Sequence, residues 1–159
     1  MDSSDPRCVL WQKGIALMIF YHDAWYKVGR EQGLNEKMSA EWAFKDCGEY
    51  ITVPFQQMLT QGIEATATHT LERVHPSHQR EVGLLLDLDL KSLGVSSSLF
   101  EAITEAIWQE YEPVATREEY DTGRAEWART FLKRPFIYHT EWFIERFEDQ
   151  ARKNLKALI

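Results

Sequence analysis

The chain has 159 residues, 44% of them hydrophobic and 27% charged, and its formal net charge is −7 at pH 7. This length and composition favour a folded domain with a hydrophobic core and exclude a chain that is disordered over most of its length. Because the net charge is acidic and the basic residues are scattered, nucleic acid is not expected as a partner. No apolar stretch is long enough to predict a membrane span.

Apolar residues recur with helical spacing over residues 11–27, which predicts the first helix there. Its apolar face would carry Ile15, Met18, Ile19 and His22. Asp23 would then lie one step further round the same helix, so that the ring of His22 and the carboxylate of Asp23 reach one point at the helix edge. A second helix is expected to be capped by Asn35 and to end at Gly48.

Pro54 suits the first turn of a third helix, expected over residues 53–69. One face of this helix would carry Met58, Gly62, Ala65 and His69. A polar connection broken by Pro76 follows. The apolar segment GLLLDLDLKSLG then predicts a helix that ends at Gly94.

The last part of the chain contains two pairs with the spacing of a capping box, Ser98 with Glu101 and Thr116 with Glu119. Each pair is expected to open a helix. Thr140 is expected to cap a final helix. Together the patterns predict an all-α fold of about seven helices, arranged as a bundle.

Residues 10–159 are expected to form a single domain that follows a short leader of residues 1–9. The two cysteines, Cys8 and Cys47, make neither a disulfide framework nor a set of four metal ligands. We therefore expect two reduced thiols in a cytoplasmic protein.

Several polar side chains stand within apolar sequence, where burial is costly unless an ion or a donor compensates. His22 and Asp23 end an apolar run, and imidazole with carboxylate suits a divalent transition metal. The alternative is a core histidine whose ring N–H is satisfied locally. His69 lies on the apolar side of its expected helix. Asp87 and Asp89 would project to opposite sides of their helix, so one is expected at the site and the other at the surface.

Seven motifs follow one another along the chain: FYHDAWY, NEKMSA, ATATH, LLLDLDLKSLG, YDTGR, FLKRPFIYHT and ARKNL. In this order they resemble the family of predicted metal-dependent phosphohydrolases of the HD superfamily, and the resemblance extends from about residue 10 to the end. It implies an HD-type helical bundle. In that superfamily a first histidine, a His-Asp pair and a distant aspartate bind a metal that activates water for attack on a phosphoester, often of a nucleotide.

The resemblance implies a metal site made by His22 and Asp23, as the His-Asp pair, together with a distant aspartate. Asp89 is the preferred aspartate and Asp87 the alternative. The ion would be divalent, and Mn, Fe, Co, Ni, Zn and Mg all remain open. His69 matches a further histidine of the family, which either adds a ligand or acts in catalysis by holding or orienting the water or the phosphate.

Two other residues are candidates for the same reaction. Glu36 would serve as an acid or base near a metal-bound water. Arg124 would hold a substrate phosphate, because the guanidinium fork matches phosphate oxygens, with ion pairing to nearby acids as the alternative. The expected partner is a small phosphorylated substrate, with neither nucleic acid nor membrane, and a homodimer is a further expectation.

One feature departs from the family pattern: no histidine precedes His22, whereas the resemblance places a metal-binding histidine upstream of the pair. A truncated sequence, a site with a reduced ligand set, and a degenerate member without catalysis are the three explanations. Two functions therefore stay open. One is an HD-type phosphohydrolase, and the other is a non-catalytic HD-like domain that acts by self-association or by binding a partner.

Overall fold

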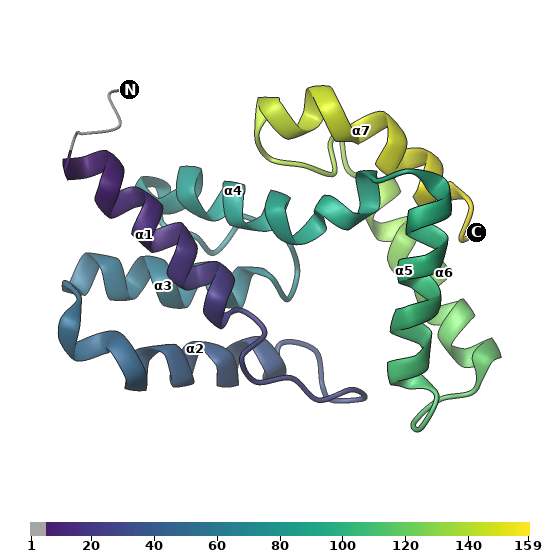
Figure 1. The fold of residues 1–159 in the computed structure, drawn as a ribbon, viewed down its shortest axis with the longest axis horizontal. Helices are drawn as coiled ribbons and strands as arrows, with labels where there is room; N and C mark the ends of the chain where they lie inside the picture. Colours follow the sequence, from purple (N-terminus) through teal and green to yellow (C-terminus); the bar gives the residue numbers. More distant parts are fainter. Residues whose placement is uncertain (1–5) are drawn as a thin grey trace. The chain divides into compact units, whose positions relative to one another are not determined.

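A computed structural model describes the backbone of residues 6–159 and the side chains of residues 12–159. Within that range it contains seven α-helices and no strand, which confirms the all-α prediction (Figure 1). The chain divides into two compact units, the first ending at Asp89 and the second running from Leu90 to Ile159. Whether they act as a single domain stays a prediction. The expected leader and the thiol of Cys8 lie outside the residues that the structure describes fully.

The first unit is built from four helices: α1 (Pro6–Tyr21), α2 (Leu34–Cys47), α3 (Val53–Ala65) and α4 (Gln79–Asp89). Two short 3-10 helices, η1 (Gly48–Tyr50) and η2 (Pro76–His78), join them. In Figure 1, α2 runs alongside α3, and α1 crosses α3 and α4. The core between these helices includes the buried side chains of Met18, Leu59, Ile63, Val82 and Leu86.

Glycine permits a close contact between α1 and α3. A Cβ atom on Gly62 of α3 would collide with the sulfur of Met18 on α1. The expected apolar face of α3 is confirmed in part, because Met58, Gly62 and Ala65 are buried. Pro54 stands in the first turn of α3 as predicted.

α1 ends earlier than its apolar pattern predicts, at Tyr21 rather than at residue 27. His22 and Asp23 therefore lie in the turn that follows the helix, and the prediction that both project from its side is wrong. The ring nitrogen Nδ1 of His22 lies 2.8 Å from the carbonyl oxygen of Ile19. A carbonyl near the end of the helix is thereby satisfied by a side chain.

Asn35 does not cap α2. The helix begins after Gly33, whose φ of 83° suits glycine, and the amide of Asn35 instead contacts the loop before the helix. Gly48 is the C-cap of α2, as predicted.

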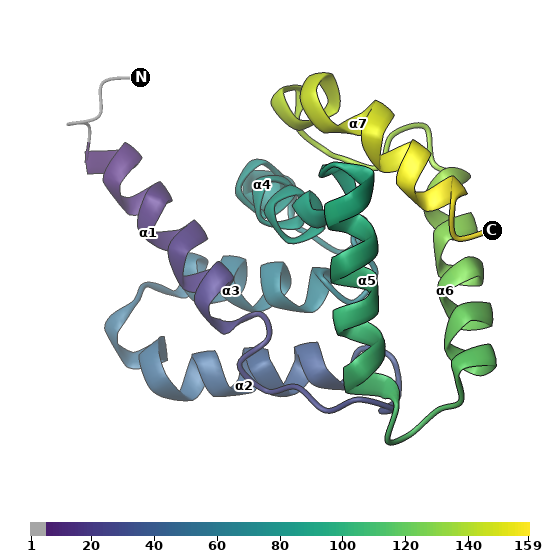
Figure 2. The ribbon, with the colours of Figure 1, turned by 45° about the vertical axis from the view of Figure 1, so that its right-hand side comes forward.

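The second unit contains the 3-10 helix η3 (Leu90–Gly94) and three helices, α5 (Ser97–Tyr111), α6 (Arg117–Leu132) and α7 (Glu141–Lys156). Figures 1 and 2 show α5 beside α6, joined by a short loop, with α7 across one end of the pair. Its core includes the fully buried side chains of Phe131, Ile137, Tyr138 and Leu155.

The helix starts of the second unit test the predicted caps. Thr116 and Glu119 form the expected capping box at the start of α6. Ser98 does not open α5, because the N-cap residue is Ser96 and makes no side-chain hydrogen bond to the helix. Thr140 is the N-cap residue of α7 as predicted, but its side chain makes no cap hydrogen bond to the helix. Among the described helices, none is both long enough and apolar enough to cross a membrane.

Candidate functional site

Four polar side chains of the first unit, His22, Asp23, His69 and Asp89, meet near the end of α1. His22 and Asp23 lie in the turn after α1, His69 lies in the loop after α3, and Asp89 is the last residue of α4. The ring nitrogen Nε2 of His22 lies 3.3 Å from Oδ2 of Asp23 and 3.4 Å from Oδ1 of Asp89. Three segments distant in sequence thus bring these side chains into contact with one another.

The orientation of the His22 ring is set by the backbone. Because the carbonyl oxygen of Ile19 only accepts hydrogen bonds, the Nδ1 atom that it contacts carries a proton. This leaves Nε2 directed at two carboxylates. The ring N–H of His22 is thus satisfied locally, as the alternative expected, while the second ring nitrogen faces Asp23 and Asp89.

His69 reaches the same point from a strained backbone. α3 ends at Ala65, so His69 lies beyond the helix and not on its apolar face as predicted. Its φ of 51° is in the left-handed region, which residues other than glycine seldom adopt. Its Nε2 lies 2.9 Å from Oδ2 of Asp89. The cost of this conformation is consistent with a role that needs the ring in that place.

The charges at this point depend on one another. The hydrogen bond to Asp89 raises the pKa of His22 to about 9, although burial acts against this. Burial alone would raise the pKa of Asp89, but hydrogen bonds from His22 and His69 hold it well below its usual value. Burial raises the pKa of Asp23, and the charge on His22 offsets part of this rise. Without a bound ion, His22 is an imidazolium that compensates Asp89.

Two side chains of α2 hold the turn that carries His22 and Asp23. The hydroxyl of Ser39 accepts a hydrogen bond from the backbone N–H of Trp25 at 3.0 Å and donates one to the Trp25 carbonyl at 3.1 Å. One turn earlier on α2, Asn35 makes the same two kinds of bond to the backbone of Lys27, at 3.1 and 3.2 Å. Sequence reasoning missed this role, although both residues belong to the NEKMSA motif.

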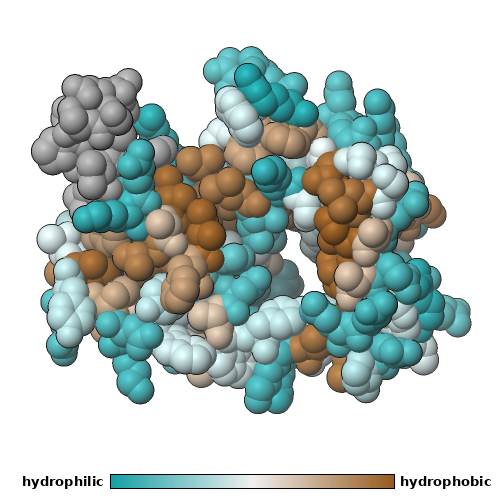
Figure 3. All heavy atoms as spheres, viewed as in Figure 1, coloured by the Kyte–Doolittle hydropathy of each residue, from teal (hydrophilic) through white to brown (hydrophobic). Residues whose placement is uncertain are grey.

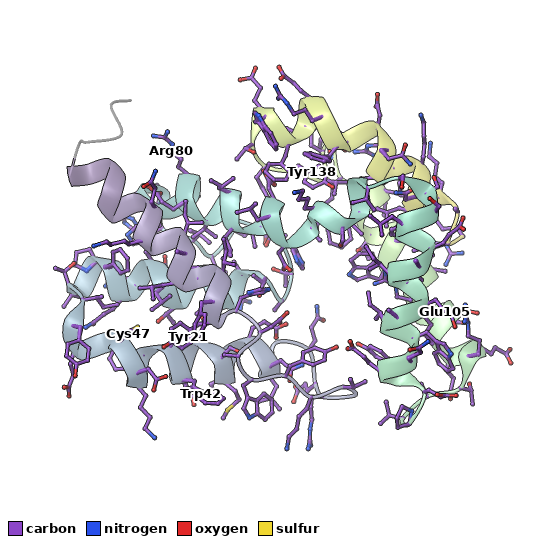
Figure 4. All side chains as sticks on the ribbon, in the orientation of Figure 1. Tyr21, Trp42, Cys47, Arg80, Glu105 and Tyr138 are labelled. Atoms are coloured by element: carbon purple, nitrogen blue, oxygen red, sulfur yellow. The ribbon has the colours of Figure 1, made fainter. Side chains whose placement is uncertain are left out.

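The last residue of α1 adds a further contact to α2. Figure 4 shows the side chain of Tyr21 at the end of α1, and its hydroxyl donates to Oδ2 of Asp46 on α2 at 3.3 Å. The end of α1 is thus fixed on the same helix that holds the following turn.

The remaining candidates lie elsewhere. Asp87 is fully buried, so the expectation that the second aspartate of α4 lies at the surface is wrong. Glu36 stands in the first turn of α2, and no hydrogen bond or ion pair between described residues joins it to the four side chains. Arg124 lies on α6, in the second unit.

The donor types of the four side chains fit a divalent ion, since imidazole nitrogen and carboxylate oxygen both bind Mn²⁺, Fe²⁺ and Zn²⁺. Ligands about 2.0–2.1 Å from a tetrahedral ion lie about 3.3–3.4 Å from each other, and the two contacts of His22 measure 3.3 and 3.4 Å. The fit is not complete. Among the described residues, no group of three or more His, Cys, Asp and Glu side chains is arranged round a common point as metal ligands.

Comparisons with known proteins supply no relative for this site. No protein-family model, curated protein or solved structure matches the chain. The resemblance to the HD superfamily therefore stays a prediction that rests on the sequence motifs.

Proposed function

We propose that the chain is an HD-type helical domain that binds a divalent metal ion and hydrolyses a phosphoester of a small molecule. His22, Asp23 and Asp89 would hold the ion. The observation that carries the proposal is the approach of the His22 ring to both carboxylates, since these residues come from separate segments and adjoin one another at a partly exposed point. A cytoplasmic location belongs to the same proposal.

Each protein group has a definable part in this proposal. A bound divalent ion would lower the pKa of a water molecule and neutralise charge on a phosphoester. The hydrogen bond from Nδ1 to Ile19 reserves Nε2 of His22 as the ligating atom. Asp23 is the most exposed member, with 63% of its side chain accessible, and so lies on the side from which a substrate would arrive.

His69 is better suited to orient Asp89 than to bind the ion itself. Its Nε2 lies 2.9 Å from Oδ2 of a carboxylate that is ionised at neutral pH, so this nitrogen carries a proton and donates a hydrogen bond to that oxygen. The bond fixes one oxygen of Asp89 and leaves the other toward His22. Histidine–carboxylate pairs of this kind commonly orient metal ligands.

The first test is metal content. Protein purified without a His-tag, saturated in turn with Mn²⁺, Fe²⁺, Co²⁺, Ni²⁺, Zn²⁺ and Mg²⁺ and then desalted, should retain close to one equivalent of at least one of these metals by elemental mass spectrometry. The variants His22→Gln and Asp89→Asn should lose it, while His75→Gln, which changes an exposed histidine outside the site, should keep it. Absence of metal from the wild-type protein would contradict the proposal.

A phosphoester panel follows on the metal-loaded protein. Release of phosphate from a nucleotide or another small phosphoester should require the metal and should be lost in Asp23→Ala. Metal retention without any turnover would refute hydrolysis and leave only the binding part of the proposal.

A non-catalytic domain that self-associates is the second candidate. Large apolar side chains of the first unit are exposed, among them Phe20 at 73% and Tyr50 at 84%. Figure 3 shows hydrophobic surface over α1 in the first unit. Sedimentation velocity of wild-type protein and Phe20→Ser distinguishes the candidates, because a dimer held by this surface should become a monomer in the variant.

A further inference from the structure

The second unit holds an aromatic cluster between α5 and α6 that the proposed hydrolysis does not use. The rings of Trp108 and Tyr120 are 5.3 Å apart between centroids, and those of Tyr111 and Tyr120 are 5.4 Å apart. On α6, Tyr120, Arg124 and Trp127 are spaced to share one helix face. We call this set the α5–α6 cluster: Trp108, Tyr111, Tyr120 and Trp127.

Arg124 places a cation within the α5–α6 cluster. Its guanidinium carbon lies 4.3 Å from the centre of the Trp127 ring. Its Nε atom is buried without a hydrogen-bond partner, and no described carboxylate forms an ion pair with it. Burial lowers the pKa of Arg124. A buried N–H group without a hydrogen-bond partner is costly, so its presence needs a reason.

A second polar atom without a partner adjoins the same cluster. The hydroxyl oxygen of Thr104 on α5 is buried and makes no hydrogen bond to any described residue. Thr104 is a direct neighbour of Tyr120, whose hydroxyl donates to the Thr104 carbonyl at 3.1 Å. Buried polar groups nearly always have partners, so two such atoms round one tyrosine mark this place as a candidate binding site.

A neighbouring arginine of the same unit, Arg117, does have acidic partners. Arg117 lies over the ring of Trp108, at 5.5 Å. It also forms ion pairs with Glu105 at 2.8 Å and with Asp121 at 2.9 Å. Glu105 is labelled on α5 in Figure 4. Arg117 thus has the acidic partners that Arg124 lacks, although both stack on tryptophan.

We propose that the α5–α6 cluster is a binding site for a phosphate group, held by the guanidinium of Arg124 and the hydroxyl of Thr104. The guanidinium of Arg124 lies over the ring of Trp127, and its N–H groups would bind the phosphate oxygens. The hydroxyl of Thr104 adds a donor. The site lies wholly within the second unit, so the proposal does not depend on a metal in the first.

The test is a titration of the metal-free, full-length chain with inorganic phosphate. Binding is measured by calorimetry and by tryptophan fluorescence. Phosphate should give a saturable signal in the wild-type protein, and acetate at equal ionic strength should not. Arg124→Gln should remove the signal, and Thr104→Val should weaken binding about tenfold, the factor expected for one lost hydrogen bond to a charged group. Arg117→Gln is the matched control and should bind phosphate as the wild type does.

Asp23→Ala separates this site from the proposed metal site and should bind phosphate normally. A wild-type protein without a saturable response would overturn the inference, as would equal binding by the wild type and a folded Arg124→Gln variant. If Arg124→Gln fails to fold, unchanged binding by Thr104→Val would overturn the role of the hydroxyl, and an equal response to acetate would overturn the choice of phosphate.

Discussion

The replacement Arg152→Ala should destabilise the second unit strongly, because one side chain serves several groups there. The guanidinium of Arg152 forms an ion pair with Glu148, one turn earlier on α7, at 2.7 Å. It also donates hydrogen bonds to three main-chain carbonyls at and after the end of α6, those of Leu132, Arg134 and Pro135. Truncation to alanine removes all of these bonds at once.

The expected loss of stability follows from the buried carboxylate that Arg152→Ala leaves behind. Glu148 has only 9% of its side chain exposed, and it accepts hydrogen bonds from the backbone N–H groups of Ile137 and Tyr138. Without Arg152 its charge stays buried without a cation. Removing one partner of a buried ion pair costs about 3–5 kcal/mol. Since the side chain of Arg152 is 25% exposed, we expect the lower end, about 3 kcal/mol.

Urea unfolding followed by circular dichroism measures this loss. The matched control is Arg146→Ala on the same helix. Arg146 forms an ion pair with Glu145, and their side chains are 48% and 60% exposed. This exposed pair should contribute at most about 1 kcal/mol. A loss in Arg152→Ala no larger than in the control would refute the claim that the buried pair fixes the connection between α6 and α7.

Three further predictions concern the first unit and the start of α6. Ser39→Ala removes both hydrogen bonds to Trp25 and should lower the free energy of unfolding in urea by about 1–3 kcal/mol. Calorimetry should also show weaker metal binding by this variant. Unchanged metal affinity would show that the site does not need Ser39 to hold the turn. Thr116→Ala should destabilise the chain at pH 7 and much less at pH 3, because the cap lowers the pKa of Glu119, so its stabilisation is present above the ordinary glutamate pKa and is lost as the pH falls through the lowered value. In metal-free protein, an NMR titration should give His22 a pKa near 9. The stability that protonated His22 contributes should be full below pH 6.5, its ordinary pKa, and should be lost as the pH rises through about 9. A measured pKa near 6.5 would contradict the contact with Asp89.

The helices were predictable because each has a local signal. Apolar spacing, Pro54 at the start of α3 and the Thr116 capping box each act over a few residues and needed no knowledge of the rest of the chain. The predicted caps were wrong where a polar side chain could form hydrogen bonds either to its own helix or to a nearby loop. Asn35 stands where a cap would, but it bonds to the backbone of Lys27 across a loop, and nothing in the spacing distinguishes these uses.

The sequence indicates which residues are candidates for the site better than it indicates how their side chains are positioned. Asp89 contacts both histidines while Asp87 is fully buried, and the choice of Asp89 as the metal ligand stays a prediction. Which of two aspartates faces a given point depends on how α4 is rotated against its neighbours, and this is set by packing. The role of Ser39 left no sequence signal, because a serine within a helix is ordinary.

The early end of α1 makes the arrangement of His22 and Asp23 possible. Had the helix continued, adjacent side chains would diverge by about 100° round its axis, whereas in the turn the His22 nitrogen and the Asp23 oxygen are 3.3 Å apart. The turn is held by α2, and Asp89 comes from α4, so the site forms only when the first unit is folded. None of these four side chains comes from the second unit. Loss of metal binding and loss of phosphate binding should therefore be separable by single substitutions.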